Sequence, residues 1–318
     1  MLGVAEARAR ILDALRPTGP ETVPLADAAG RVLARAVAAR LTQPPAAISA
    51  MDGYAVHAAD AVAGARLRLV GAAPAGHPFP GGVGTGEAVR IFTGGFVPPG
   101  ADGILLQEDA TAEGDGVIAR EAVTQGRWIR PAGLDFAAGE ALLAPGRRLT
   151  ARDIGLAAAA NHPWLAVHRR PRIGILATGD EIALPGEPVP AGGIVSSNSF
   201  ALAAMIRAAG GEPLLLPVAP DDPAALLATA RGARGCDLLL TSGGASVGDH
   251  DQTVAALARE GFALDFWKIA MRPGKPLVFG NWNGLPVIGF PGNPVSTIVC
   301  AVVFLLPVLA RLDRKSVV

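Results

Sequence analysis

The sequence predicts a multidomain α/β protein, in which a β-rich part precedes an α/β part with a mainly parallel sheet. Its 318 residues are too many for one ordinary compact core, which indicates two or three domains. Short apolar runs separated by glycine and proline fill residues 21–128, as expected of a β-rich domain. After Arg172, apolar strands alternate with helical segments, and this alternation is typical of parallel βαβ units.

Two helices are predicted before Arg172. Residues 1–16 place apolar residues at helical spacing among charged ones and carry no export signal. Thr150 followed by Asp153 is a pattern that begins a helix, here over 150–160, and we expect this helix to pack beside the first. Between them, strands are predicted at Leu67–Val70, Ala88–Phe92, Ile104–Gln107 and Gly116–Ile118.

The part after Arg172 is predicted to bind a ligand at one edge of its sheet. In open parallel sheets ligands bind beyond the carboxyl ends of the strands, so the loops after Ala177, Leu240 and Ile288 are the candidates. The apolar stretch 295–310 is expected to be a buried helix rather than a membrane span, because it is short and contains Pro307. Strands are predicted at 173–177, 213–218, 237–241 and 286–289, and helices at 199–209, 222–231 and 251–259.

Charge and cysteine content argue against several classes of protein. Lys+Arg and Asp+Glu both number 28, so the net charge favours neither nucleic acid nor an anionic membrane as a partner. Cys236 and Cys300 lie far apart in the sequence and lack metal-ligand spacing, which indicates neither a disulfide framework nor a zinc site. We therefore expect a cytoplasmic protein.

The loop 241–251 carries the clearest signal for ligand binding. It follows a predicted strand and precedes a predicted helix, and its glycines let backbone N–H groups approach an oxyanion closely. Asp249 and Asp251 offer oxygen ligands suited to Mg²⁺ beside a phosphate. A glycine-rich turn with a capping aspartate is the structural alternative. The loop residues predicted to bind the phosphate-bearing ligand are Ser242, Gly243, Gly244, Ser246 and Gly248.

Two later segments offer groups for anions. Lys268, Arg272 and Lys275 place three cations within eight residues beside a Pro-Gly turn, which suits oxoanion binding or, alternatively, a solvated turn. Asn293 is expected to cap a helix that begins at Pro294, and anion binding would be a second use of the same N–H groups.

Polar residues also follow other predicted strands. In the segment Thr-Gly-Asp-Glu that ends at Glu181, two carboxylates lie at the predicted sheet edge. The sequence supports two roles for them equally, capping of a helix and contact with a ligand. Asp52 precedes a glycine turn and Thr93 precedes two glycines. By pattern alone, both are ordinary turn residues.

Seven segments, taken in order, resemble the molybdopterin molybdenumtransferase family, the molybdenum insertases that include bacterial MoeA and the C-terminal half of gephyrin. They are MDGYA (51–55), TGG (93–95), RPAGLD (130–135), TGDE (178–181), SGGASVGD (242–249), KIAMRPGKP (268–276) and PGNPVS (291–296). The resemblance covers nearly the whole chain. It implies that molybdate is inserted into adenylylated molybdopterin, with Mg²⁺-assisted release of AMP.

The resemblance also implies roles for particular residues. Our mechanistic hypothesis is that the 242–248 loop holds the pterin or its pyrophosphate, that Asp249 and Asp251 recruit Mg²⁺, and that Lys268, Arg272 and Lys275 hold molybdate. Pro291 and Pro294 would shape the site wall, with Asn293 in the same substrate-binding turn. The residues implied as catalytic are Asp52, Thr93, Asp135, Glu181, Asp221, Asp251 and Lys268.

The architecture implied by the resemblance has a discontinuous helical domain (1–20 plus 129–168), a β-rich domain (21–128) and a three-layer α/β molybdopterin-binding domain (169–318). The family's small β-barrel domain, which normally follows the helix ending near Leu312, is expected to be absent. A homodimer with a shared cleft is implied, with the adenylyltransferase and apo-molybdoenzymes as further partners. Arg272 stands where the family usually has lysine, which changes size and hydration. A molybdopterin adenylyltransferase and a non-catalytic carrier or scaffold for the cofactor intermediate are the alternative functions.

Overall fold

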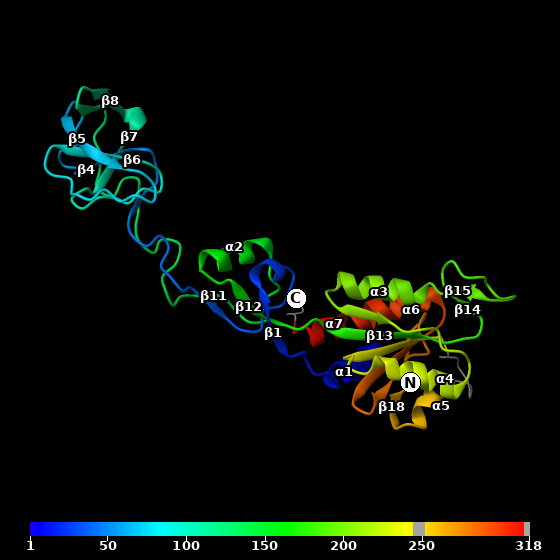
Figure 1. Ribbon diagram of the computed structural model, residues 1–318. Helices are drawn as coiled ribbons and strands as arrows, with labels where there is room; N and C mark the ends of the chain where they lie inside the picture. The colour runs from blue at the N-terminus through cyan, green and yellow to red at the C-terminus, as the bar shows by residue number, and fades with distance from the viewer. Residues whose placement is uncertain (244–251, 315–318) are drawn as a thin grey trace. The chain divides into compact units, whose positions relative to one another are not determined.

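The computed structural model describes residues 1–243 and 252–314 (Figure 1). By its internal contacts, the chain divides into two compact units. The larger unit consists of Met1–Ala36, Ala144–Ile154 and Trp164–Val318, and the smaller of Val37–Leu143 and Gly155–Pro163.

The smaller unit is built on a six-stranded sheet in the order β7-β4-β6-β5-β9-β8. Neighbouring strands are antiparallel except for the parallel pair β5 and β6. Four strands coincide with the predicted apolar runs, so the β-rich character of this part is confirmed. The strands are β4 (Gly53–Val56), β5 (Arg66–Ala73), β6 (Glu87–Ile91), β7 (Gly103–Leu106), β8 (Ala110–Glu113) and β9 (Gly116–Ala119), with the short pairs β2 (Val37–Ala38) and β11 (Ala141–Leu143), and β3 (Ile48–Ser49) and β10 (Ile129–Arg130).

Gly53 allows β4 to pair closely on both sides. A Cβ at this position would collide with the carbonyl oxygen of Leu105 on β7, so a larger residue would force the two strands apart. On the other side, Gly53 pairs with Ile91 of β6. Because the pair is antiparallel, Asp52 and Thr93 lie at the same edge of the sheet.

The larger unit contains a second six-stranded sheet, in the order β16-β13-β17-β20-β19-β18. The first four strands are parallel, as predicted, while β18 and β19 add an antiparallel edge that the sequence reading did not anticipate. The strands are β13 (Arg172–Ala177), β16 (Glu212–Leu215), β17 (Leu238–Ser242), β18 (Phe262–Phe266), β19 (Val278–Trp282) and β20 (Leu285–Phe290). Outside this sheet lie the pairs β1 (Pro20–Pro24) and β12 (Trp164–His168), and β14 (Ile182–Ala183) and β15 (Ile194–Val195).

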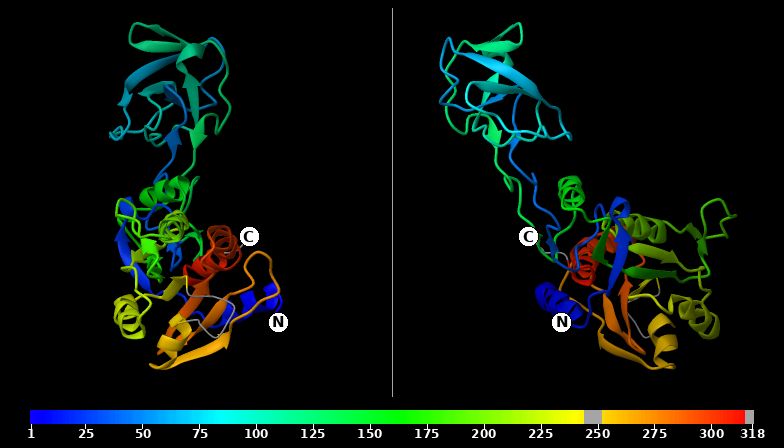
Figure 2. Two further views of the ribbon diagram at one scale, coloured as in Figure 1. Left: turned by 90° about the vertical axis from the view of Figure 1, so that its right-hand side faces the viewer. Right: turned by 60° about the vertical axis from the view of Figure 1, so that its left-hand side comes forward.

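Helices cover both faces of this sheet and make three layers (Figures 1 and 2). Along β17, Leu240 belongs to one apolar core and Leu239 to another, because successive side chains of a strand point to opposite faces. The first core contains residues of α1, α3 and the C-terminal helix, and the second contains residues of α4 and α5. The helices are α1 (Val4–Asp13), α3 (Asn198–Ala208), α4 (Pro223–Ala230) and α5 (Gln252–Ala258).

The first helix does not pack as expected. Ala7, Ile11 and Leu15 of the N-terminal segment share one face and are buried in the core of the larger unit, where α1 contacts α7 (Leu306–Leu312). By contrast, Leu156 of α2 (Ala151–Ala159) packs in a small cluster around Phe136 in the smaller unit. The apolar face of α1 is therefore covered in the core of the larger unit, where α7 is its neighbour, rather than by α2.

The C-terminal helix consists of α6 (Pro294–Cys300), a π-helical turn (Ala301–Leu305) and α7 (Leu306–Leu312). By length and composition, its 19 residues, with a mean hydropathy of 2.3, are enough to cross a membrane. However, one side of the helix, including Cys300, Phe304 and Val308, is buried in the first core of the sheet. It is a core helix, as predicted, and its π turn lies where Pro307 removes a backbone N–H.

Candidate functional site

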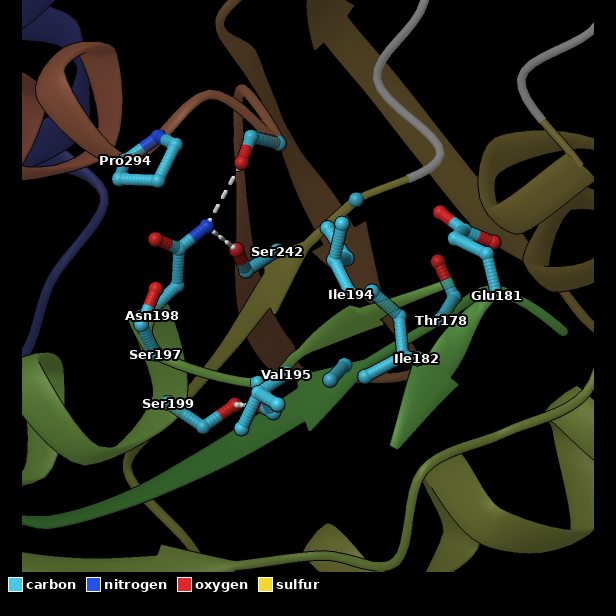
Figure 3. A pocket seen from close by; sticks show the side chains of 14 residues that line it. Thr178, Glu181, Ile182, Ile194, Val195, Ser197, Asn198, Ser199, Ser242 and Pro294 are labelled. Carbon is cyan, nitrogen blue, oxygen red and sulfur yellow. Dashed lines mark hydrogen bonds between the residues drawn. The ribbon is translucent and has the colours of Figure 1, made fainter. Parts of the chain in front are cut away.

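Three parallel strands end side by side and bring their following loops together. In the register of the sheet, Ala177 of β13 pairs with Ser242 of β17, and Ser242 pairs with Phe290 of β20. A cavity of about 150 Å³ opens at this carboxyl edge (Figure 3). It is lined by Ala177, Thr178, Glu181, Ile182, Ile194, Val195, Ser196, Ser197, Asn198, Ser199, Ser242, Gly243, Gly292 and Pro294.

Asn198 ties two of these loops together. Its Nδ2 donates one hydrogen bond to Ser242 Oγ at 2.9 Å and another to the carbonyl oxygen of Gly292 at 2.8 Å (Figure 3). Both amide protons are thus used, and the two acceptors belong to β17 and to the turn after β20. Sequence reasoning missed this residue. The polar run Ser-Ser-Asn-Ser at 196–199, just before an apolar helix, is the signal that marks it.

Gly243 allows the loop after β17 to pass close to the loop after β13. Its φ of +98° lies in the region that favours glycine, and an added Cβ would lie 2.6 Å from the carbonyl oxygen of Thr178. The hydroxyl Oγ1 of Thr178 is buried and has no hydrogen-bond partner among the described residues. An unpaired buried hydroxyl is costly unless a ligand or a water satisfies it, and Thr178 lines the cavity.

Several predicted site residues reach this cavity or its surroundings. Glu181, Ser242, Gly243 and Pro294 all line it. Asp221 lies beside the Thr-Gly-Asp-Glu turn, where its backbone N–H donates to Asp180 Oδ1 at 3.1 Å. Carboxylate oxygens therefore gather at the same sheet edge as the cavity.

The turn before α6 has the predicted form. The side chain of Asn293 accepts a hydrogen bond from the N–H of Ser296 at 3.1 Å, which confirms it as the helix cap, and Pro294 occupies the first turn. The carbonyl of Pro291 accepts a hydrogen bond from Thr297 Oγ1 at 2.6 Å. These contacts hold the turn that presents Gly292 and Pro294 to the cavity.

The three predicted cations do not line this cavity. Nζ of Lys268 lies 3.7 Å from the centre of the Trp267 ring. Arg272 and Lys275 line a separate hollow of about 360 Å³ together with Met1. The described wall of the cavity therefore carries no positive side chain, and it offers hydroxyl, amide and backbone groups instead.

Asp52 and Thr93 form a compact pair in the smaller unit. Asp52 Oδ1 accepts hydrogen bonds from the backbone N–H of Thr93 at 2.7 Å and from Thr93 Oγ1 at 2.8 Å. These bonds, the backbone one foremost, together with the charge of Arg90, lower the pKa of Asp52. Asp135 lies in another turn of this unit, where its N–H donates to the carbonyl of Gln43 at 3.0 Å and its side chain is exposed.

The remaining predicted residues, Gly244, Ser246, Gly248, Asp249 and Asp251, lie outside the described residues. Within 1–243 and 252–314, no three His, Cys, Asp or Glu side chains gather as a metal cluster.

The larger unit belongs to the class of open α/β proteins, and its cavity lies at the carboxyl edge of the parallel strands, where such proteins bind ligands. Residues 174–311 match the family described as probable molybdopterin binding domain, and residues 2–161 match the MoeA N-terminal region (domain I and II). The chain belongs to the molybdopterin molybdenumtransferase family, as its motifs predicted.

Individual relatives are similar to this chain over most of its length. The molybdopterin molybdenumtransferase of Nostoc sp. is 37% identical over 301 residues, which cover 92% of this chain and 69% of the relative. That of Haemophilus influenzae is 36% identical, over 99% of this chain and 79% of its own. The crystal structure of a molybdopterin biosynthesis MoeA protein from Pyrococcus horikoshii OT3 matches with a TM-score of 0.86 at 29% identity, over 100% of this chain and 80% of its own.

Proposed function

We propose that this protein inserts molybdate into adenylylated molybdopterin and releases AMP, a step of molybdenum cofactor biosynthesis. The observation that carries this proposal is the similarity to molybdopterin molybdenumtransferases over 92% and 99% of the chain. Because residues 2–161 match the MoeA N-terminal region as well, the similarity extends beyond the molybdopterin-binding part. This extent argues against the alternative of a molybdopterin adenylyltransferase.

The described residues act in this proposal by positioning the substrate. Ser242 and Gly243 bind its phosphate-bearing part, together with the loop that continues to Gly248. Thr178 Oγ1, buried without a partner among the described residues, is available to hydrogen-bond the ligand. Holding reactants in a fixed geometry contributes to rate without a protein nucleophile.

Mg²⁺ is the metal that we propose for the reaction. In proteins, Mg²⁺ is usually held by one or two carboxylates together with substrate phosphates rather than by a complete protein cage. The carboxylates of Asp180 and Glu181 beside the cavity fit such a setting. Asp249 and Asp251 would hold the ion, and when bound it would neutralise phosphate charge.

The cations and the smaller unit have proposed roles as well. Lys268, Arg272 and Lys275 would hold molybdate, a role supported by their concentration in one segment. Asp52, Thr93 and Asp135 would act from the smaller unit, which the paired hydrogen bonds of Asp52 and Thr93 support.

We also propose the three-domain organisation with boundaries near residues 20, 128 and 168, a homodimer, and a cytoplasmic location. Apo-molybdoenzymes and the adenylyltransferase would be its partners. These proposals rest on the family resemblance.

Purified protein, incubated with adenylylated molybdopterin, Mg²⁺ and molybdate, tests the function directly. We expect AMP release together with reconstitution of an apo-molybdoenzyme. Asp251→Asn and Lys268→Ala should lower both rates, while Arg259→Ala, an exposed arginine outside the proposed site, should not. Tight substrate binding without AMP release would instead support a carrier, and ATP-dependent adenylylation would support the adenylyltransferase.

A further inference from the structure

A second cavity, of about 170 Å³, lies in the larger unit and shares no lining residue with the cavity at the sheet edge. Four arginines from four separate segments converge on it: Arg31, Arg148, Arg170 and Arg207. Arg148 precedes α2, Arg170 lies between β12 and β13, and Arg207 belongs to the last turn of α3. Gly30, His168, Gly210 and Asp313 are also in its wall.

These arginines differ in how their charge is compensated. Arg31 is 8% exposed, and its guanidinium donates to Glu21 and, at 2.9 Å, to the carbonyl of His168. Arg148 is exposed, and its Nε donates to the carbonyl of Gly30 at 3.3 Å. A buried, paired arginine thus forms the base of the cavity wall, and its charge is balanced by Glu21.

The other guanidinium groups leave an excess of positive charge. Arg170 and Arg207 are exposed, and in residues 1–243 and 252–314 no hydrogen bond or ion pair of either side chain is present. Asp313 supplies one negative charge to the wall. In a chain whose positive and negative residues both number 28, three arginines without a carboxylate partner around one small cavity are a local concentration of positive charge.

We propose that this cavity binds a small, multiply charged oxyanion, either inorganic phosphate or the phosphate group of an ester. A guanidinium presents its N–H groups as a planar fork that matches two oxygens of such an anion. The volume of about 170 Å³ lies below the roughly 300–1,000 Å³ of pockets for drug-sized ligands, so it suits a phosphate group but not an enclosed nucleoside or peptide.

A purely structural role explains only part of this arrangement. Arg207 in the last turn of α3 complements the negative end of the helix dipole. That account does not extend to Arg148 and Arg170, which belong to no helix. Convergence of separate segments on one cavity is what a binding site requires.

Calorimetric titration of the full chain with inorganic phosphate tests the proposal. We expect a dissociation constant of about 1 mM or lower, rising with salt concentration. Arg170→Ala and Arg207→Ala should each weaken binding about tenfold, because each removes a charge-assisted contact. Arg207→Lys keeps the positive charge but loses the planar guanidinium, so its dissociation constant for phosphate should lie between those of the parent and Arg207→Ala. Arg259→Ala, which removes an exposed arginine elsewhere, should bind phosphate like the parent.

Two further measurements identify the site and the source of the phosphate. Since the side chains of Arg170 and Arg207 are exposed and make no hydrogen bond or ion pair within the described residues, thermal unfolding of the variants should match the parent, so lost binding would not reflect misfolding. Lys268→Ala should retain phosphate binding, which separates this cavity from the proposed reaction site. Tighter binding of AMP than of inorganic phosphate, with the same arginine dependence, would identify an ester as the ligand, and weaker binding of AMP would identify inorganic phosphate. Absence of binding at 10 mM phosphate, about ten times the expected constant, or binding unchanged by both arginine substitutions, would overturn the proposal.

Discussion

Replacing Asn198 by alanine removes the donor of two hydrogen bonds that hold the loops after β17 and β20 together, at 2.9 Å to Ser242 Oγ and 2.8 Å to the Gly292 carbonyl. Each such bond contributes about 0.5–1.5 kcal/mol net, so together they stabilise the arrangement by about 1–3 kcal/mol. Asn198 is only half-buried, and water replaces part of this interaction. We therefore expect the lower end of the range, which corresponds to a KM for adenylylated molybdopterin about five- to tenfold higher.

Steady-state AMP release and thermal unfolding measured side by side distinguish positioning from simple stabilisation. Asn281→Ala is the matched control, since it removes the 2.7 Å bond to the N–H of Gly284 in a turn outside the cavity. Both variants should lose stability, Asn281→Ala less because it loses one bond instead of two, but only Asn198→Ala should raise KM, with a smaller change in kcat. If Asn198→Ala unfolds earlier and its KM equals that of Asn281→Ala, the positioning argument is refuted.

Two other substitutions probe the close packing and the charge of the site. Gly243→Ala should cost about 1–3 kcal/mol of stability and reduce substrate binding, because its Cβ would collide with Thr178 at a positive φ. Gly186→Ala, with φ +90° and open space around it, should show the backbone strain alone; equal binding losses in both would contradict this explanation. Thr93→Val should raise the pKa of Asp52 towards its ordinary value, as measured by NMR titration. Because the pKa of Asp52 is lowered in the folded protein, the stability that its ionised carboxylate provides is present above the ordinary carboxyl pKa and is lost as pH falls. Thr93→Val should therefore be less stable than the parent above the ordinary carboxyl pKa, and the difference should vanish as pH falls.

Much of the fold was predictable from local patterns. Residues 173–177 of β13 and 238–240 of β17 are apolar and buried, as expected of strands covered on both faces, and Asn293 followed by Pro294 marked the start of α6. The antiparallel strands β18 and β19 were missed. In β18 only Phe262 and Phe266 are buried, so the strand shows no clean alternation of apolar and polar residues.

Local sequence was enough to predict the family, the alternation of the parallel strands with helices, and which loops follow those strands, because these depend on residues that are neighbours in the chain. Which side chains meet became clear from the folded structure alone. Asn198 joins partners 44 and 94 residues away, and the wall of the second cavity brings Arg31 and Asp313 together from near opposite ends of the chain. Such contacts depend on strand register and on the packing of helices over the sheet, which side-chain pattern along the chain does not encode locally.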